Sequence, residues 1–121
     1  MKYLLIMQVN PAVLDALTEE ERNEIGSGHG DFMKAIQDSG EFILTQALAD
    51  PANSKVVRGT GGAPAVTDGP YGEVKELLAG LFQIDVESLD RAVEIAGPLS
   101  EYGWVEIRPV MEDAGDGDVT G

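Results

Sequence analysis

His29 is the only histidine of the chain and the first candidate for chemistry. Histidine is the side-chain type whose unperturbed pKa lies near neutrality, which suits a general acid or base. His29 also falls at helical spacing with Ile25, Phe32 and Ile36, so it could instead be packed in the core. Both interpretations remain open at this point.

The triplet Asp68, Gly69 and Pro70 is the second candidate. An aspartate carboxylate can close a turn, glycine takes an unusual dihedral angle and proline fixes the next one, so a turn explains the triplet without a ligand. Alternatively, the turn places Tyr71 and the start of a following helix at a cleft, where free backbone donors could bind an anion. Asp68 could also orient His29.

Arg108 is a candidate for binding a carboxylate, with Asp85 on the same predicted face of a sheet. The structural alternative is an ion pair of Arg108 with Glu106 or Asp85 across neighbouring strands. The glycines of 26–30 and 59–62 lack the spacing of nucleotide-binding loops, and no metal-ligand spacing accompanies His29. We therefore assign no cofactor-binding or metal-binding residues, and the cofactor is unknown.

Composition narrows the class of protein. The chain has 121 residues, 43% hydrophobic and 25% charged, which fits one globular domain. It contains no cysteine, so disulfides and thiolate sites are excluded. The net charge of −14, with 8 basic and 22 acidic residues, argues against nucleic acid or an anionic membrane as partner. The apolar N-terminus is too short for a span and lacks signal-peptide features, so we expect a cytoplasmic protein.

Periodicity predicts four main strands, a hairpin and two main helices. The first helix should follow Thr18 and Glu21, which have capping-box spacing, and the second should follow Ser88 and end at Gly97. Three glycines inside the first helix cost about 3 kcal/mol, so either that helix starts late or something packs closely there. We expect strands over 2–9, 42–48, 81–87 and 104–110, hairpin arms over 55–58 and 65–67, and a short helix over 73–79.

These elements predict an α+β fold: a ferredoxin-like βαββαβ antiparallel sheet with an inserted hairpin, both helices lying on one face. The open face then mixes apolar and charged side chains, which fits a second copy packed across it with a wet cleft between. We therefore expect a homodimer, a domain over 1–111 and an acidic mobile tail over 112–121. The predicted open-face residues are Leu4, Ile6, Gln83, Asp85, Glu106 and Arg108.

The block TDGPYGEVKELLAGLFQIDVESLDRA, residues 67–92, resembles the DGPF group of the YCII-related family. The opening KYLLIM, the acidic TEEER before the first helix, Val57–Arg58 and the closing VEIRPV are similar as well. The resemblance implies a dimeric ferredoxin-like α/β barrel. It implies no single function, because some relatives resemble small-molecule lyases or dehydrochlorinases and others accompany extracytoplasmic-function sigma factors.

The resemblance also implies a site made of a histidine early in the first helix and an aspartate near its end, which His29 and Asp38 match. Nine residues of one helix rotate by roughly 900°, so a direct contact needs a broken helix, an Asp38 beyond the helix end, or a partner subunit. Two functions follow as hypotheses. One is lyase-like acid/base chemistry by His29, oriented by Asp38 or Asp68, on a small anionic molecule bound by Arg108. The other is a non-catalytic ligand-binding or regulatory module associated with a sigma factor.

Overall fold

The computed structural model describes residues 1–59, 61–69, 77–101 and 103–112, and shows an α+β fold. A short 3-10 turn, Pro51–Asn53, precedes the hairpin. The elements follow in the order β1 (Lys2–Val9), α1 (Pro11–Asp15), α2 (Glu19–Asp38), β2 (Phe42–Ala47), β3 (Lys55–Arg58), β4 (Ala65–Asp68), β5 (Leu77–Asp85), α3 (Leu89–Leu99) and β6 (Gly103–Pro109).

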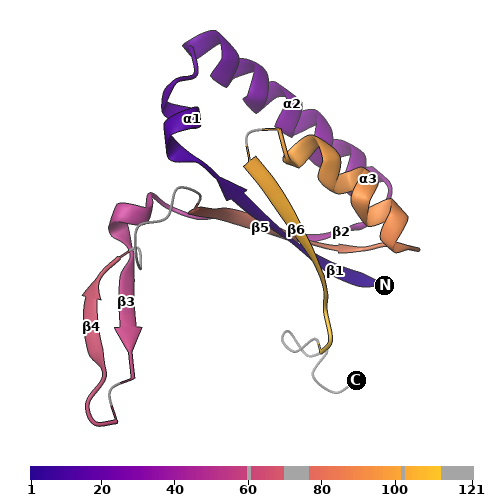
Figure 1. Ribbon diagram of the computed structural model, residues 1–121. Coiled ribbons are helices and arrows are strands. Elements are labelled where there is room, and N and C mark those ends of the chain that lie inside the picture. Colours follow the sequence, from indigo (N-terminus) through magenta and orange to yellow (C-terminus); the bar gives the residue numbers. More distant parts are fainter. Residues whose placement is uncertain (60, 70–76, 102, 113–121) are drawn as a thin grey trace.

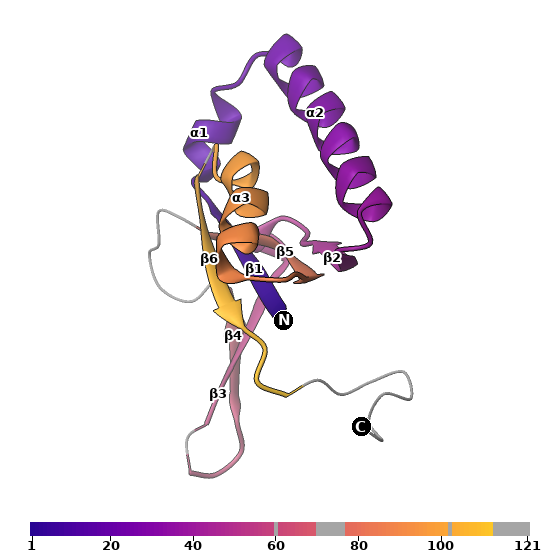
Figure 2. The ribbon, with the colours of Figure 1, turned by 90° about the vertical axis from the view of Figure 1, so that its right-hand side faces the viewer.

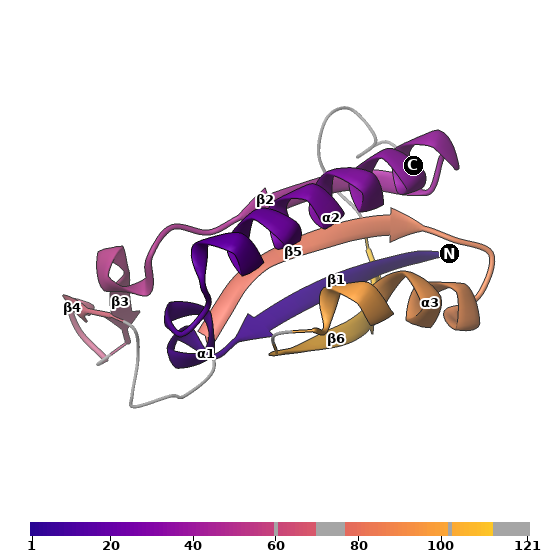
Figure 3. The same ribbon diagram turned by 90° about the horizontal axis from the view of Figure 1, so that it is seen from above.

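Four strands form one antiparallel sheet in the order β2-β5-β1-β6. Because α2 connects β1 to β2 across β5, and α3 connects β5 to β6 across β1, two strand–helix–strand units interleave. Both helices lie on the same face of the sheet (Figures 1 and 3). The topology is compatible with the predicted ferredoxin-like fold.

The core lies between the sheet and the helices. Phe82 and Leu5, on neighbouring strands, are fully buried, and the ring of Phe32 from α2 meets Phe82 edge-on at 5.6 Å between centroids. Ile36 of α2 and Ala92 of α3 complete the contact from above. Side chains alternate along a strand, so burying one face of β1 sends Leu4 and Ile6 to the other.

The ends of α2 are determined locally. Thr18 accepts from the Glu21 backbone and Glu21 accepts from the Thr18 backbone, which completes the predicted capping box. Gly40, with φ of 79°, ends the helix in the left-handed conformation that glycine tolerates. The two explanations predicted for the glycines inside α2 are wrong for the single chain. The helix starts at Glu19, and a Cβ added at these glycines would meet nothing within 4 Å.

Three local predictions are corrected. Leu77–Ala79 was expected to end a short helix but belongs to β5, because Leu77 and Leu78 pair with β1 and the Ala79 carbonyl accepts from the Leu48 amide. The rest of that predicted helix, 73–76, lies outside the described residues. The helix α3 continues through Gly97 and Pro98 to Leu99, since a proline in the last turn removes few hydrogen bonds. A short helix, α1, follows Asn10 and was not predicted.

The buried stripe of α3 also differs from the prediction. Ala92 and Ala96 are buried as expected, but Ile95 takes the place given to Val93 and Leu89. Val93 is 53% exposed and Leu89 is 51% exposed. Packing of α3 on the sheet buries a neighbouring stripe of this helix, whose apolar residues have an equally suitable spacing.

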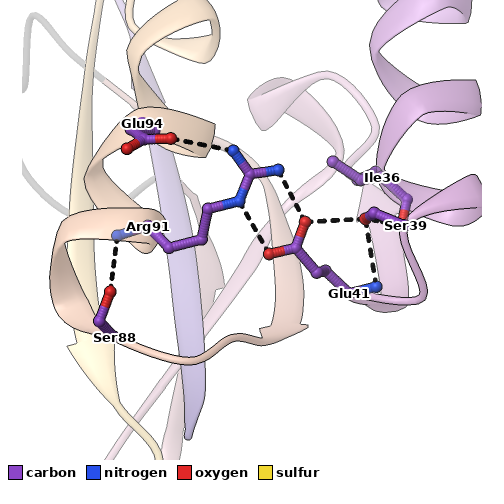
Figure 4. A network of polar contacts seen from close by, with 6 residues as sticks. All are labelled: Ile36, Ser39, Glu41, Ser88, Arg91 and Glu94. Carbon is purple, nitrogen blue, oxygen red and sulfur yellow. Dashed lines mark hydrogen bonds and ion pairs between the residues drawn. The ribbon is translucent and has the colours of Figure 1, made fainter.

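A polar network ties α3 to the loop between α2 and β2 (Figure 4). Arg91 donates to both carboxylate oxygens of Glu41, at 2.8 and 2.7 Å, and to Glu94 at 3.0 Å. Ser39 also donates to Glu41, at 2.7 Å. The Arg91 hydrogen bonds outweigh desolvation and hold the pKa of the Glu41 carboxyl at about 2.

The hairpin of β3 and β4 leaves the sheet on the side opposite the helices (Figures 1 and 2). Its two strands form a separate two-stranded sheet. At its base, the Gly69 amide donates to the Ser54 carbonyl at 2.8 Å. The tail predicted to be mobile lies, from residue 113 on, outside the described residues.

Candidate functional site around His29

A cavity of about 360 Å³ opens beside His29 between the helices and the end of β1. Its wall is mainly apolar, and Ile25 and Phe32 of α2 lie on it one turn before and after the histidine. Three parts of the chain distant in sequence meet here, so the cavity exists only in the folded protein. The other lining residues are Met7, Val9, Leu14, Glu24, Gly28, Pro98, Leu99 and Glu101.

The His29 imidazole is neither buried in the core nor isolated from it. Its ring lies 6.0 Å from the ring of Phe82, centroid to centroid and tilted by 58°, while the residue as a whole is exposed. Among the described residues no hydrogen bond to the imidazole is found. A ring supported on one side by an aromatic core residue, with its nitrogens unengaged by described groups, can bind a ligand or exchange a proton.

Two carboxylates, Glu24 and Glu101, line the same cavity and were not predicted. Glu24 immediately precedes the apolar stripe of α2, so its position in the sequence was only a weak indication that it lies near His29. Glu101 follows α3, and only the packing of α3 beside α2 could reveal it. The described residues of the lining include these two carboxylates and neither lysine nor arginine, so acidic groups lie beside His29.

Asp38 lies away from this cavity. It is the last residue of α2, which runs unbroken from Glu19, so nine residues separate it from His29 by about 13.5 Å along the helix axis. Its carboxylate accepts from Lys34 at 2.9 Å and is 67% exposed. His29 and Asp38 therefore do not contact each other within one subunit. A contact between His29 and Asp38 of a partner subunit stays a prediction.

Asp68 lies at the end of β4 on the projecting hairpin, where it pairs with Lys55. The hairpin and α2 lie on opposite sides of the sheet, so Asp68 does not approach His29 within the subunit (Figure 1). The Gly69 hydrogen bond to Ser54 supports the interpretation of this segment as a turn. Tyr71 lies outside the described residues.

Arg108 and Asp85 lie on the sheet face opposite His29. Arg108 forms an ion pair with Glu106, as the structural alternative predicted, but both residues lie on β6 and the pair does not cross neighbouring strands. Asp85 accepts from the N-terminal ammonium at 2.8 Å, and that hydrogen bond lowers the pKa of its carboxyl. The sheet separates these two residues from the cavity, so Arg108 and His29 cannot bind one small molecule within one subunit.

Within the part of the chain that the structure describes, no three histidine, cysteine or acidic side chains gather as a metal site would require. No helix there combines the length and apolar character needed to cross a membrane.

Comparison with known proteins identifies the family. The model of the YCII-related domain matches residues 1–113. The chain belongs to the YCII-related family. An uncharacterized protein of Rhizobium meliloti (strain 1021) is 28% identical over 114 residues, which cover 91% of this chain and 92% of the relative. The YCII-related match confirms the predicted family, whereas membership of its DGPF group stays a prediction.

Proposed function

We propose that this YCII-related protein binds a small neutral or cationic molecule in the His29 cavity, and that His29 acts on it as an acid or base. The observation that carries the proposal is an imidazole with no hydrogen-bond partner among the described residues, placed at an apolar cavity. A volume of about 360 Å³ suits a small metabolite. Glu24 and Glu101 line the same cavity and are the carboxylates we assign to assist, and lyase-like proton transfer is the reaction class.

A non-catalytic ligand-binding or regulatory module, associated with an extracytoplasmic-function sigma factor, is the second candidate. It is favoured by the lack of a carboxylate contact that would orient His29 among the described residues. In catalytic triads, a carboxylate accepts a hydrogen bond from the histidine and so fixes the tautomer of this base. Binding without turnover would distinguish this candidate from the first.

The test uses the fact that one histidine gives one imidazole signal. Protein labelled with ¹³C-histidine is mixed with panels of small amines, neutral carbonyl compounds and carboxylates, and the imidazole signals are followed by NMR. We expect some amines or neutral compounds to shift the signals, and carboxylates to leave them in place. Any compound that binds is then followed for turnover.

The matched variants are His29→Gln and Gln37→Ala, the latter on an exposed part of α2 outside the cavity. If His29 is the acid or base, His29→Gln should lower turnover by about 10²- to 10⁴-fold while Gln37→Ala retains it. Turnover retained in His29→Gln would contradict catalysis by His29. Binding without turnover would favour the second candidate, and no binding from any panel would contradict both.

We further propose that the protein is a homodimer in which the open face of one sheet packs on that of a second copy, as in a dimeric α/β barrel. The strand register places the following side chains on the open face, opposite the helices: Lys2, Leu4, Ile6, Gln8, Leu44, Gln46, Leu78, Leu81, Gln83, Asp85, Trp104, Glu106 and Arg108. Trp104 is 57% exposed, and Leu78 and Leu44 are also exposed. Apolar side chains gathered on one face typically mark an interaction surface.

Charge supports the same interface. The chain carries −14, but on the open face Asp85 is matched by the N-terminal ammonium and Glu106 by Arg108. The helices carry more acid: α2 has six acidic and two basic residues. Two copies can therefore approach through their open faces with little of the repulsion expected elsewhere on the surface.

A further inference from the structure

We propose that the β3–β4 hairpin is an arm that packs against the second copy covering the open face. This inference rests on the proposed dimer and deepens it, because it assigns a contact to a part of the chain outside the four-stranded sheet. The occupant is a second copy of this chain.

Among the described residues, β3 and β4 pair with no strand of the four-stranded sheet. These two strands pair with each other, and a two-stranded ribbon is at best marginally stable in water. Val57 and Val66 lie directly opposite each other on one face, at 64% and 62% exposure. A cross-strand pair of β-branched residues favours a packed environment. Val57 and Val66 therefore form an exposed apolar pair that is available for packing against another molecule.

The direction of the hairpin indicates which molecule it would contact. The helices rise from one side of the sheet and the hairpin extends from the other (Figures 1 and 2). This second side is the one that the open face borders. A molecule seated on the open face would consequently lie beside the hairpin, and a twofold dimer would give each subunit one such arm.

The charge of the hairpin fits a second copy of an acidic chain. Its strands hold two basic residues, Lys55 and Arg58, and one acidic residue, Asp68. The chain as a whole carries −14. An arm that is not acidic can approach the body of another copy, whereas an acidic arm would be repelled.

The first experiment exploits the absence of cysteine from the chain. The variant Val57→Cys gives one thiol on the hairpin, and Val93→Cys gives a control thiol on α3, where the native valine is similarly exposed at 53%. Alkylation by N-ethylmaleimide is measured from dilute to concentrated protein, with sedimentation equilibrium run in parallel on each variant. The fluorescence of Trp104, the single tryptophan, reports the open face in the same samples.

As the dimer forms, we expect alkylation of Val57→Cys to slow by at least about tenfold, that of Val93→Cys to stay constant, and the emission of Trp104 to shift to the blue. A dimer with a shifted Trp104 signal but an unprotected Val57→Cys would overturn the arm and leave the sheet dimer standing. Protection that persists in samples that sedimentation shows to be monomeric would mean that the hairpin is covered by its own chain, which also overturns the arm. Absence of a dimer would overturn both proposals.

A second experiment measures the contribution of the arm to affinity. The double variant Val57→Ser, Val66→Ser should weaken the dimer by at least about tenfold in Kd, which corresponds to about 1.4 kcal/mol. The control Val93→Ser should leave Kd unchanged. Equal Kd values for the double variant and the native protein would overturn the arm, provided that circular dichroism shows both folded.

Discussion

Gly26, Gly28 and Gly30 lie within the continuous helix α2 around His29 without a steric reason inside the subunit. A Cβ added at any of them would meet none of the described atoms within 4 Å. Gly103 is the opposite case, because a Cβ there would lie 1.9 Å from the Gln8 carbonyl oxygen on β1. The glycines of α2 therefore have room for a side chain within the subunit, whereas Gly103 allows the backbones of β1 and β6 to approach closely.

We predict that Gly26→Ala and Gly30→Ala each stabilise the protein by about 1 kcal/mol, because alanine loses less backbone entropy in a helix. Gly103→Ala should destabilise it by about 2 kcal/mol or more, since β1 and β6 must move apart. Urea unfolding of the three variants measures both effects. If Gly26→Ala were destabilising at high protein concentration alone, the glycine would be packing against a second subunit.

At the scale of elements, the Glu41–Arg91 ion pair joins the loop after α2 to α3. The Glu41 side chain is 16% exposed and that of Arg91 is 35% exposed, so water screens the pair less than an ordinary surface pair. The pKa of Glu41 falls from 4.5 to about 2 in the folded protein. A depressed carboxyl pKa stabilises the fold at pH values above the unfolded pKa, and this contribution is lost as pH falls through the folded value.

We predict that Glu41→Gln lowers the free energy of unfolding by about 1–2 kcal/mol at neutral pH. The difference from the native protein should shrink between about pH 5 and about pH 2, where Glu41 becomes protonated in the native chain as well. The control is Glu94→Gln, whose carboxylate contacts the same Arg91 but is 67% exposed. It should cost less than about 0.5 kcal/mol. A pH-independent effect of Glu41→Gln would show that the charge is not the cause.

At the scale of the whole molecule, the proposed dimer would form through the open face. Trp104 is its largest exposed apolar side chain, and aromatic residues dominate the energy of protein interfaces. The matched charges beside it limit how far added salt can strengthen or weaken such a contact. Association should therefore depend on Trp104 more than on ionic strength.

We predict that Trp104→Glu weakens the dimer by at least about tenfold in Kd while leaving the free energy of unfolding of the monomer nearly unchanged. Sedimentation equilibrium and urea unfolding measure the two quantities. Raising NaCl from about 0.05 to about 0.5 M should change the native Kd by less than about threefold. An unchanged Kd in Trp104→Glu would place any dimer interface elsewhere.

Features that depend on neighbours along the chain could be predicted from the amino-acid sequence. The capping box of Thr18 and Glu21, the end of α2 at Gly40, and the buried alternation of Phe82 and Ile84 follow from local hydrogen bonding, backbone freedom and side-chain period. The α+β class and the open face could be predicted because a sheet with both helices on one face leaves the other face uncovered.

Which candidate residues lie close together depends on how the elements pack in three dimensions. His29 and Arg108 were predicted for one site, yet the sheet lies between them. His29 lies beside Phe82 on the helix-covered face of the sheet, whereas Arg108 lies beside Leu4 on the opposite face. Leu77–Ala79 became strand because β1 pairs with Leu77 and Leu78, and this pairing outweighs the local preference for helix. Glu101 joins the cavity through the packing of helices distant in sequence. Spacing along the chain carries no information about such contacts, which are selected by burial of the shared core.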